Sequence, residues 1–156
     1  MKDYFETNEK NDLQMLYEFN HSKKLFDSII PTKEKSQVDA IARHKDRTFA
    51  VEIKHRLVPL DRYKTMFIED YKLASMMLEY IINGREPLYI CILHDAILVF
   101  NLLKLKNMPK LRITDIESKG YDKMQCQERR YLLDINDAVV YKTNKPFEEC
   151  KTTDYS

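Results

Sequence analysis

The sequence of 156 residues contains only two glycines. Phosphate-binding loops and dinucleotide-binding fingerprints need several closely spaced glycines, so both kinds of site are excluded. The three cysteines, Cys91, Cys126 and Cys150, are scattered and odd in number. This spacing argues against a zinc site and favours a reducing compartment. The four histidines are also too scattered to form a histidine metal site.

The chain also lacks an excess of charge, since its formal net charge is +1. Without a basic field around the whole molecule, binding to nucleic acid would need a local basic patch. The most apolar run, from Leu88 to Leu103, is interrupted at His94-Asp95 and is too short to span a membrane. The amino-terminal residues are charged and do not resemble a secretory signal. We therefore expect a cytoplasmic protein without membrane association.

Hydrophobic residues make up 44% of the chain and charged residues 33%, which is an ordinary balance for a globular protein. The length suits one domain with a single core. We expect residues 1–141 to form this domain. Residues 142–156 have no apolar periodicity, and we expect them to form a loose tail.

Hydrophobic periodicity predicts two helices and a series of strands. A first helix is expected over 8–22. A second is expected over 61–83, where apolar residues recur at helical spacing (Phe67, Tyr71, Ala74, Leu78 and Ile81). Asn83-Gly84 provides the signal that ends the second helix. Strands are expected at about 25–30, 37–43, 48–55, 88–93 and 97–102. Residues 107–127 are polar and irregular, with a short strand expected at 131–135 and a helical turn at 136–141. The order αβββαββ predicts an α/β protein with a mixed sheet of four to five strands flanked by helices.

Two of these strands carry charged residues among apolar ones. Alternate residues of a strand point to the same face, so Glu52 and Lys54 share one face while Val51 and Ile53 take the other. If the strands on either side of Arg43–Arg47 pair as a hairpin, Asp39 comes to lie opposite Glu52. Two carboxylates and one ammonium would then meet at a place that can hold a divalent cation.

Asp39 on one strand and Glu52-Ile53-Lys54 on the next resemble the motif of the PD-(D/E)-x-K nuclease superfamily. The proline that often precedes the aspartate is replaced here by Val38. The order of elements over roughly the first ninety residues also resembles the restriction-endonuclease-like core of VRR-type and Holliday-junction-resolvase-like nucleases. This resemblance implies Mg²⁺, for which Mn²⁺ can substitute, bound by Asp39, Glu52 and the backbone carbonyl of Ile53.

The resemblance also assigns catalytic roles. Lys54 would either orient or deprotonate the attacking water, or neutralise the charge that develops on the phosphate. Lys72, on the second helix, matches a position at which family members contact phosphate or water. The alternative for Lys72 is a surface lysine whose stem covers apolar side chains.

Many family members add a glutamate from the first helix as a further metal ligand. Glu9 is the candidate here, and Glu18 competes with it because Glu18 is closer in sequence to Asp39. The alternative for Glu9 is a first-turn acid that interacts with the helix dipole.

Just after the motif, His55, Arg56 and Lys64 belong to a basic run that would bind phosphates beside the cleavage site. A solvated loop is the other interpretation of this run.

The leading hypothesis is a Mg²⁺-dependent nuclease that acts on DNA rather than RNA, with a homodimer or larger complex useful for cutting both strands of a duplex. A second hypothesis is a catalytically inactive module of the same fold that binds nucleic acid or a partner protein. A third treats Asp39, Glu52 and Lys54 as ordinary ion pairs in a structural protein.

Overall fold

The structure is a computed structural model that describes residues 2–33, 36–56, 58–117 and 125–143, without the side chains of 2–10, 117 and 125. The elements are, in chain order, α1 (Lys2–Lys23), β1 (Ser28–Pro31), β2 (Ala40–His44), β3 (Arg47–His55), β4 (Thr65–Glu69), α2 (Asp70–Asn83), β5 (Glu86–Ile92), β6 (Ala96–Asn101), β7 (Lys110–Glu117), β8 (Gln125–Asp134), the 3-10 turn Ile135–Asp137 and β9 (Val139–Lys142). No helix in these ranges is long and apolar enough to span a membrane.

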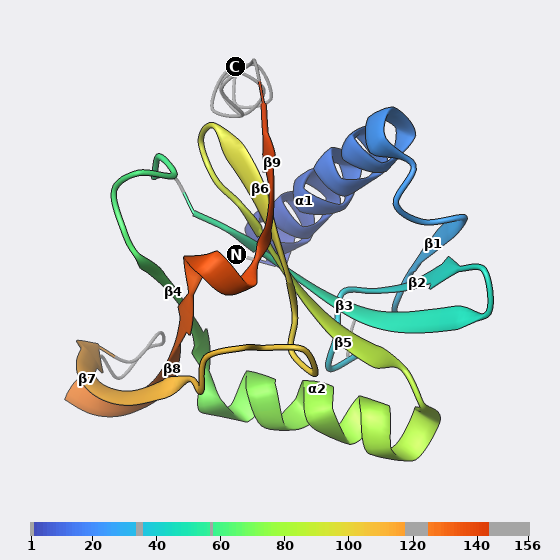
Figure 1. Ribbon diagram of the computed structural model, residues 1–156. Coiled ribbons are helices and arrows are strands. Elements are labelled where there is room, and N and C mark those ends of the chain that lie inside the picture. Colours follow the sequence, from blue (N-terminus) through green and yellow to red (C-terminus); the bar gives the residue numbers. More distant parts are fainter. Residues whose placement is uncertain (1, 34–35, 57, 118–124, 144–156) are drawn as a thin grey trace.

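The described residues form two sheets (Figure 1). The main sheet has six strands in the order β1-β2-β3-β5-β6-β9. Strand β5 runs parallel to β3, and the other neighbours are antiparallel. The predicted fold class, a mixed sheet with helices packed on it, is confirmed. The parallel pair requires a crossover, which β4 and α2 provide.

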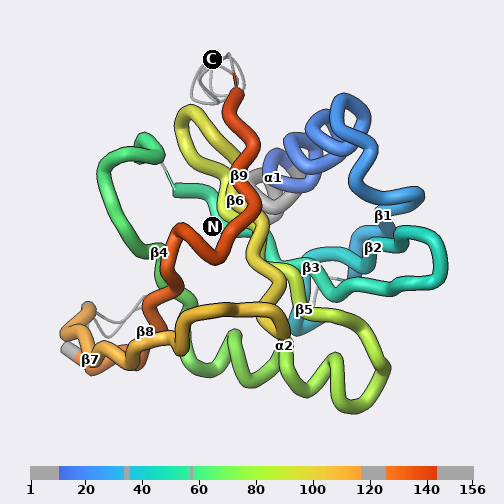
Figure 2. Tube along the Cα trace, viewed as in Figure 1, coloured from blue at the N-terminus to red at the C-terminus, as the bar shows by residue number. Residues whose placement is uncertain are grey.

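The second sheet is the main difference from the expected fold. Strand β4 pairs with β8, and β8 pairs with β7, in the order β4-β8-β7. Figure 2 shows how the late strand β8 returns to lie beside the much earlier β4. The helix predicted over 61–83 is therefore wrong in its first part, where β4 stands. The irregular segment predicted over 107–127 is likewise replaced by β7 and the start of β8.

The carboxy-terminal elements also differ from expectation. The helical turn predicted at 136–141 is reduced to the 3-10 turn Ile135–Asp137, and β9 then joins the edge of the main sheet. Strand β9 includes Lys142, where we expected the tail to begin, and residues 144–156 lie outside the described part of the chain.

The apolar stripe that predicted the second helix faces away from the core. Leu78 is 52% exposed and Ile81 is 75% exposed, whereas Met76 on the other side of α2 is fully buried. Helical spacing alone gives the period of an apolar stripe and not its direction. The end of α2 is as predicted, because Gly84 adopts the left-handed conformation (φ 68°) and donates its N–H to the Tyr80 carbonyl.

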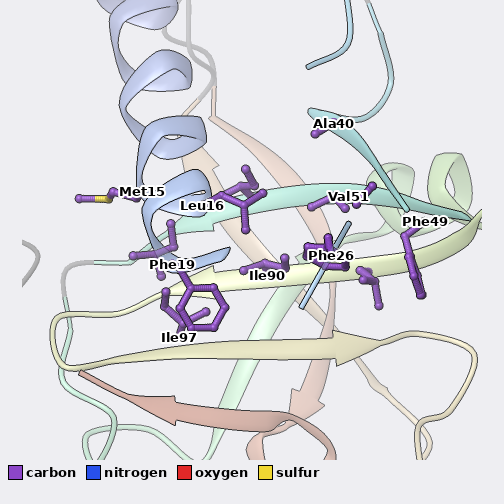
Figure 3. Close-up of a cluster of buried hydrophobic side chains, with 13 residues drawn as sticks. Met15, Leu16, Phe19, Phe26, Ala40, Phe49, Val51, Ile90 and Ile97 are labelled. Carbon is purple, nitrogen blue, oxygen red and sulfur yellow. The ribbon is translucent and has the colours of Figure 1, made fainter. Parts of the chain in front are cut away.

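The two faces of the main sheet have separate cores. Helix α1 covers one face, where its buried side chains meet those of β3, β5 and β6 (Figure 3). These residues include Met15, Leu16, Phe19, Val51, Ile90 and Ile97. On the other face, α2, β4 and β8 cover a cluster that includes Ala50, Ile68, Met76, Tyr89, Phe100 and Leu133. Because alternate residues of β3 point to opposite faces, Glu52 and Lys54 belong to the face under α2.

The packing of α1 gives a first prediction. Leu16 of α1 is fully buried against the main sheet, so Leu16→Ala should lower the free energy of unfolding by about 2–5 kcal/mol. Gln14→Ala, at an exposed position on the same helix, is the control and should change it by less than about 0.5 kcal/mol. Urea denaturation measures both. Equal effects of the two variants would contradict the packing of α1 on the sheet.

Candidate active site

The β2–β3 hairpin brings Asp39 and Glu52 together. Ala40 lies opposite Val51, which places Asp39 opposite Glu52, the pairing that the sequence predicts. The backbone N–H of Asp39 donates to the Val51 carbonyl over 2.9 Å. The Ile53 N–H donates to Asp39 Oδ2 over 2.7 Å. The Asp39 side chain thus takes the place of a backbone partner where β2 begins, and this fixes its orientation.

Glu52 is the buried charged residue of the described chain, with 6% of its surface exposed. It lies in the middle of β3, between β2 and β5. Its Oε1 accepts from Lys72 Nζ of α2 at 2.8 Å. Its Oε2 is buried, and no described group forms a hydrogen bond with it. A buried carboxylate oxygen without a partner is costly. Binding of a cation or a proton at this oxygen would therefore be favourable.

The electrostatics of the pair follow from this burial. Burial and the negative charge of Asp39 together raise the pKa of Glu52 to about 7, because the opposing effects of Lys72 and Lys54 are smaller. For Lys72, burial acts to lower the pKa, but the hydrogen bond to Glu52 and the charges of Glu52 and Asp39 outweigh burial. The pKa of Lys72 is therefore raised, and Lys72 is a cation at neutral pH.

Lys54 points to the same face as Glu52 and reaches a residue that the sequence did not identify. Its Nζ lies 3.8 Å from Oε1 of Glu69, the last residue of β4. Glu69 also precedes α2, but its side chain forms no capping hydrogen bond with that helix. The sequence did not indicate Glu69, because a helix was expected over 61–83. In the structure, Glu69 instead ends a strand and lies near Lys54.

Tyr71 is a second residue near the site that the sequence assigned to an apolar stripe. The residue is 59% exposed. Partial burial of its hydroxyl, together with the nearby charge of Glu69, raises the pKa of Tyr71. The charges of Lys72 and Glu52 also act on this hydroxyl. Tyr71 therefore lies at the rim of the site.

A metal ion would have few protein ligands here. The described residues contain no group of three or more His, Cys, Asp and Glu side chains that could hold a metal. Because Asp39 donates to the carbonyl of Val51, the carbonyl of Ile53, two residues later, points to the same side of β3. Two carboxylates and this carbonyl suit Mg²⁺, which prefers oxygen ligands and keeps several waters. The unpartnered Glu52 Oε2 fits such an ion.

The other predicted site residues are more dispersed. Glu9 lies in α1 among the residues whose side chains are not described. Glu18 is exposed, and its carboxylate accepts a hydrogen bond from Gln14, one turn earlier on the same helix.

The three residues of the predicted basic run have different environments. The His55 side chain is 6% exposed, and its Nδ1 lies 3.3 Å from Asp12 Oδ1 of α1. The Arg56 guanidinium lies over the Phe67 ring, 3.8 Å from its centre. Lys64 is exposed. Arg56 and Lys64 are thus near β4, and His55 faces α1.

No family model matches the chain, and no curated protein matches it. Among solved structures, the chain is similar to the Holliday junction resolvase Hjc of Archaeoglobus fulgidus, an archaeal hyperthermophile. The two share 13% sequence identity, and the match covers 72% of this chain and 82% of the resolvase with a TM-score of 0.47. So distant a likeness carries no inference about activity. The function of this chain is inferred from its own side chains.

The raised pKa of Glu52 predicts how stability depends on pH. The folded protein holds the Glu52 proton more tightly than the unfolded chain, whose carboxyl has a pKa near 4.5. This contribution to stability is complete below pH 4.5 and is lost as the pH rises to about 7. Glutamine cannot ionise, so the Glu52→Gln variant does not lose this stability as the pH rises. The variant should be more stable than the wild type by roughly 1–3 kcal/mol at pH 8.

At pH 4.5, where the wild-type carboxyl is also neutral, the two proteins should have similar stability. Urea denaturation at both pH values, in EDTA, makes the comparison. Glu79→Gln, two turns beyond Lys72 on α2 and paired with Arg85, is the control. A Glu52→Gln variant that is less stable than the wild type at pH 8 would contradict the predicted cost of burial.

Proposed function

We propose that this chain is a metal-dependent nuclease that hydrolyses phosphodiester bonds in nucleic acid, with DNA preferred to RNA. The proposed cation is Mg²⁺, with Mn²⁺ as a substitute. The observation that carries the proposal is the buried Glu52 carboxylate, which lies opposite Asp39 with one oxygen unpartnered. A carboxylate kept in a central strand at this cost is expected to have a function.

Asp39, Glu52 and the Ile53 carbonyl are the proposed ligands. The bound cation would polarise the phosphate and lower the pKa of a water molecule. The hydrogen bond from the Ile53 N–H to Asp39 holds this carboxylate in place for the task. Glu9 is a proposed further ligand, because the contact between Asp12 and His55 brings the same part of α1 to the end of β3.

The two lysines have complementary proposed roles. Lys54, whose side chain is 36% exposed, would orient or deprotonate the attacking water, or neutralise charge on the phosphate. Lys72 balances Glu52 when no cation is present. Once a divalent cation balances Glu52, the Lys72 ammonium becomes available to a phosphate oxygen. Arg56 and Lys64 are proposed to bind phosphates next to the scissile one, and His55 to support the end of β3.

The alternative is an inactive module that binds nucleic acid or a partner protein. The observation in its favour is that Glu52 and Lys54 already have ion-pair partners, Lys72 and Glu69. Such pairs could serve the fold alone. Activity and cation binding distinguish the two proposals.

The first test is cleavage. Supercoiled plasmid, single-stranded DNA, a four-way junction and RNA are incubated with the protein in Mg²⁺, Mn²⁺ or EDTA. We expect cutting with either cation and none in EDTA. Asp39→Asn and Lys54→Ala should reduce the rate by about 100-fold or more, because each removes a group that acts on the transition state.

Lys45→Ala is the matched control, since Lys45 is an exposed lysine in the turn between β2 and β3. It should cut as the wild type does. A folded wild-type protein that cuts none of the substrates would overturn the proposal in favour of the inactive module. Equal rates for Lys54→Ala and Lys45→Ala would remove Lys54 from the mechanism.

The second test is cation binding by titration calorimetry with Mn²⁺. A ligand must lose its proton to bind a metal, and the pKa of Glu52 is about 7. Wild-type affinity should therefore rise about tenfold between pH 6 and pH 8. Glu52→Gln should bind weakly at both values, and Glu79→Gln should follow the wild type. If Glu52→Gln bound Mn²⁺ as tightly as the wild type, Glu52 would be excluded as a ligand.

A further inference from the structure

Two arginines lie directly opposite each other on neighbouring strands of the second sheet. Arg112 of β7 pairs in register with Arg130 of β8, so both side chains point to the same face. Like charges placed opposite each other on a sheet reduce its stability. Arg112 is exposed, and no carboxylate among the described residues pairs with it. Arg130 has Glu128 as an ion-pair partner and Glu69 opposite it on β4, so Arg112 is the member of the pair that no described carboxylate neutralises.

Arg130 is held in a fixed orientation. Its guanidinium lies 4.0 Å from the centre of the Phe67 ring, and that of Arg56 lies 3.8 Å from the same centre. Two guanidinium groups this close to one ring cannot share a face, so Phe67 lies between them. Glu128 accepts from Arg130 Nε at 2.5 Å. Stacking of this kind orients a planar guanidinium in advance and leaves its outer N–H groups able to bind an anion.

The arginine pair, Arg112 and Arg130, continues a line of charges that begins at Lys54, the proposed catalytic lysine. Arg130 lies opposite Glu69 on β4, and Glu69 pairs with Lys54 at 3.8 Å. One register row of the second sheet thus contains Glu69, Arg130 and Arg112 in sequence across three strands. Lys110, two residues before Arg112 on β7, points to the same face and is exposed.

We propose that the arginine pair is a phosphate-binding subsite that holds the nucleic-acid backbone beside the cleavage centre. This inference rests on the proposed function. Arginine binds phosphate through two parallel hydrogen bonds, and the chain has a net charge of only +1. Affinity for a polyanion must then come from a local patch of this kind. A backbone that follows the row from Arg112 to Lys54 would present a phosphodiester to Asp39 and Glu52.

Binding of fluorescent single-stranded and duplex DNA, measured by anisotropy in EDTA over a series of salt concentrations, tests this subsite. EDTA prevents cleavage, so the intact protein and DNA are compared. Arg112→Ala should weaken binding roughly three- to tenfold at low salt, equally for different sequences. It should also reduce the slope of log affinity against log salt by about one. Arg112→Lys, which keeps the charge, should retain the slope.

Arg43→Ala is the control, because Arg43 is an exposed arginine on β2 and belongs to the main sheet. It should keep the wild-type slope. Arg112→Ala should unfold at the same temperature as the wild type or higher, since it relieves repulsion from Arg130. If Arg112→Ala binds as Arg43→Ala does while the wild type cuts DNA, the subsite is wrong and the proposed function stands. If the wild type neither binds nor cuts nucleic acid, both fail.

Discussion

The burial of one carboxylate in the middle of the main sheet is the constraint on which the rest of this structure depends. Glu52 lies on β3, which has a neighbouring strand on each side and a layer of structure on each face. Removing a charge from water at such a position is expensive unless it is paired. Lys72 of α2 provides one partner, but Asp39 adds a second negative charge. The two acids therefore repel each other at a buried position, and Lys72 only partly offsets this repulsion.

Strand alternation lets the protein tolerate this cost. Val51 and Ile53 point toward α1 and contribute to its apolar core, while Glu52 and Lys54 point to the other face. The stability that α1 supplies is therefore separate from the electrostatics of the site. Changes to the charged residues can alter the charge at this position without opening the α1 core. Glu52→Gln, which keeps the size of the side chain, therefore tests that charge more directly than a truncation would.

The sequence predicted what depends on local pattern. The β2–β3 hairpin and the facing of Asp39 and Glu52 follow from residues close together in the chain, where alternation is clear. The strand β4 was mistaken for helix because its partner β8 lies far along the sequence and its apolar residues fit a helical period. Glu69 was missed for the same reason: only the pairing of β4 turns its carboxylate toward Lys54. Pairing between strands so far apart in the chain cannot be predicted from the periodicity of a short stretch of sequence.

The second sheet also changes how charge is distributed on a nearly neutral chain. Lys54 is paired with Glu69, and Arg130 with Glu128, so a phosphate must compete with carboxylates for these cations. Binding of this sort is expected to be weak by itself and sensitive to salt. Under the function we propose, a divalent cation at Asp39 and Glu52 would neutralise these acids and free Lys72 from its pair with Glu52. Cation binding and phosphate binding would then strengthen each other, although the proposed cation site and the proposed phosphate subsite lie on different sheets.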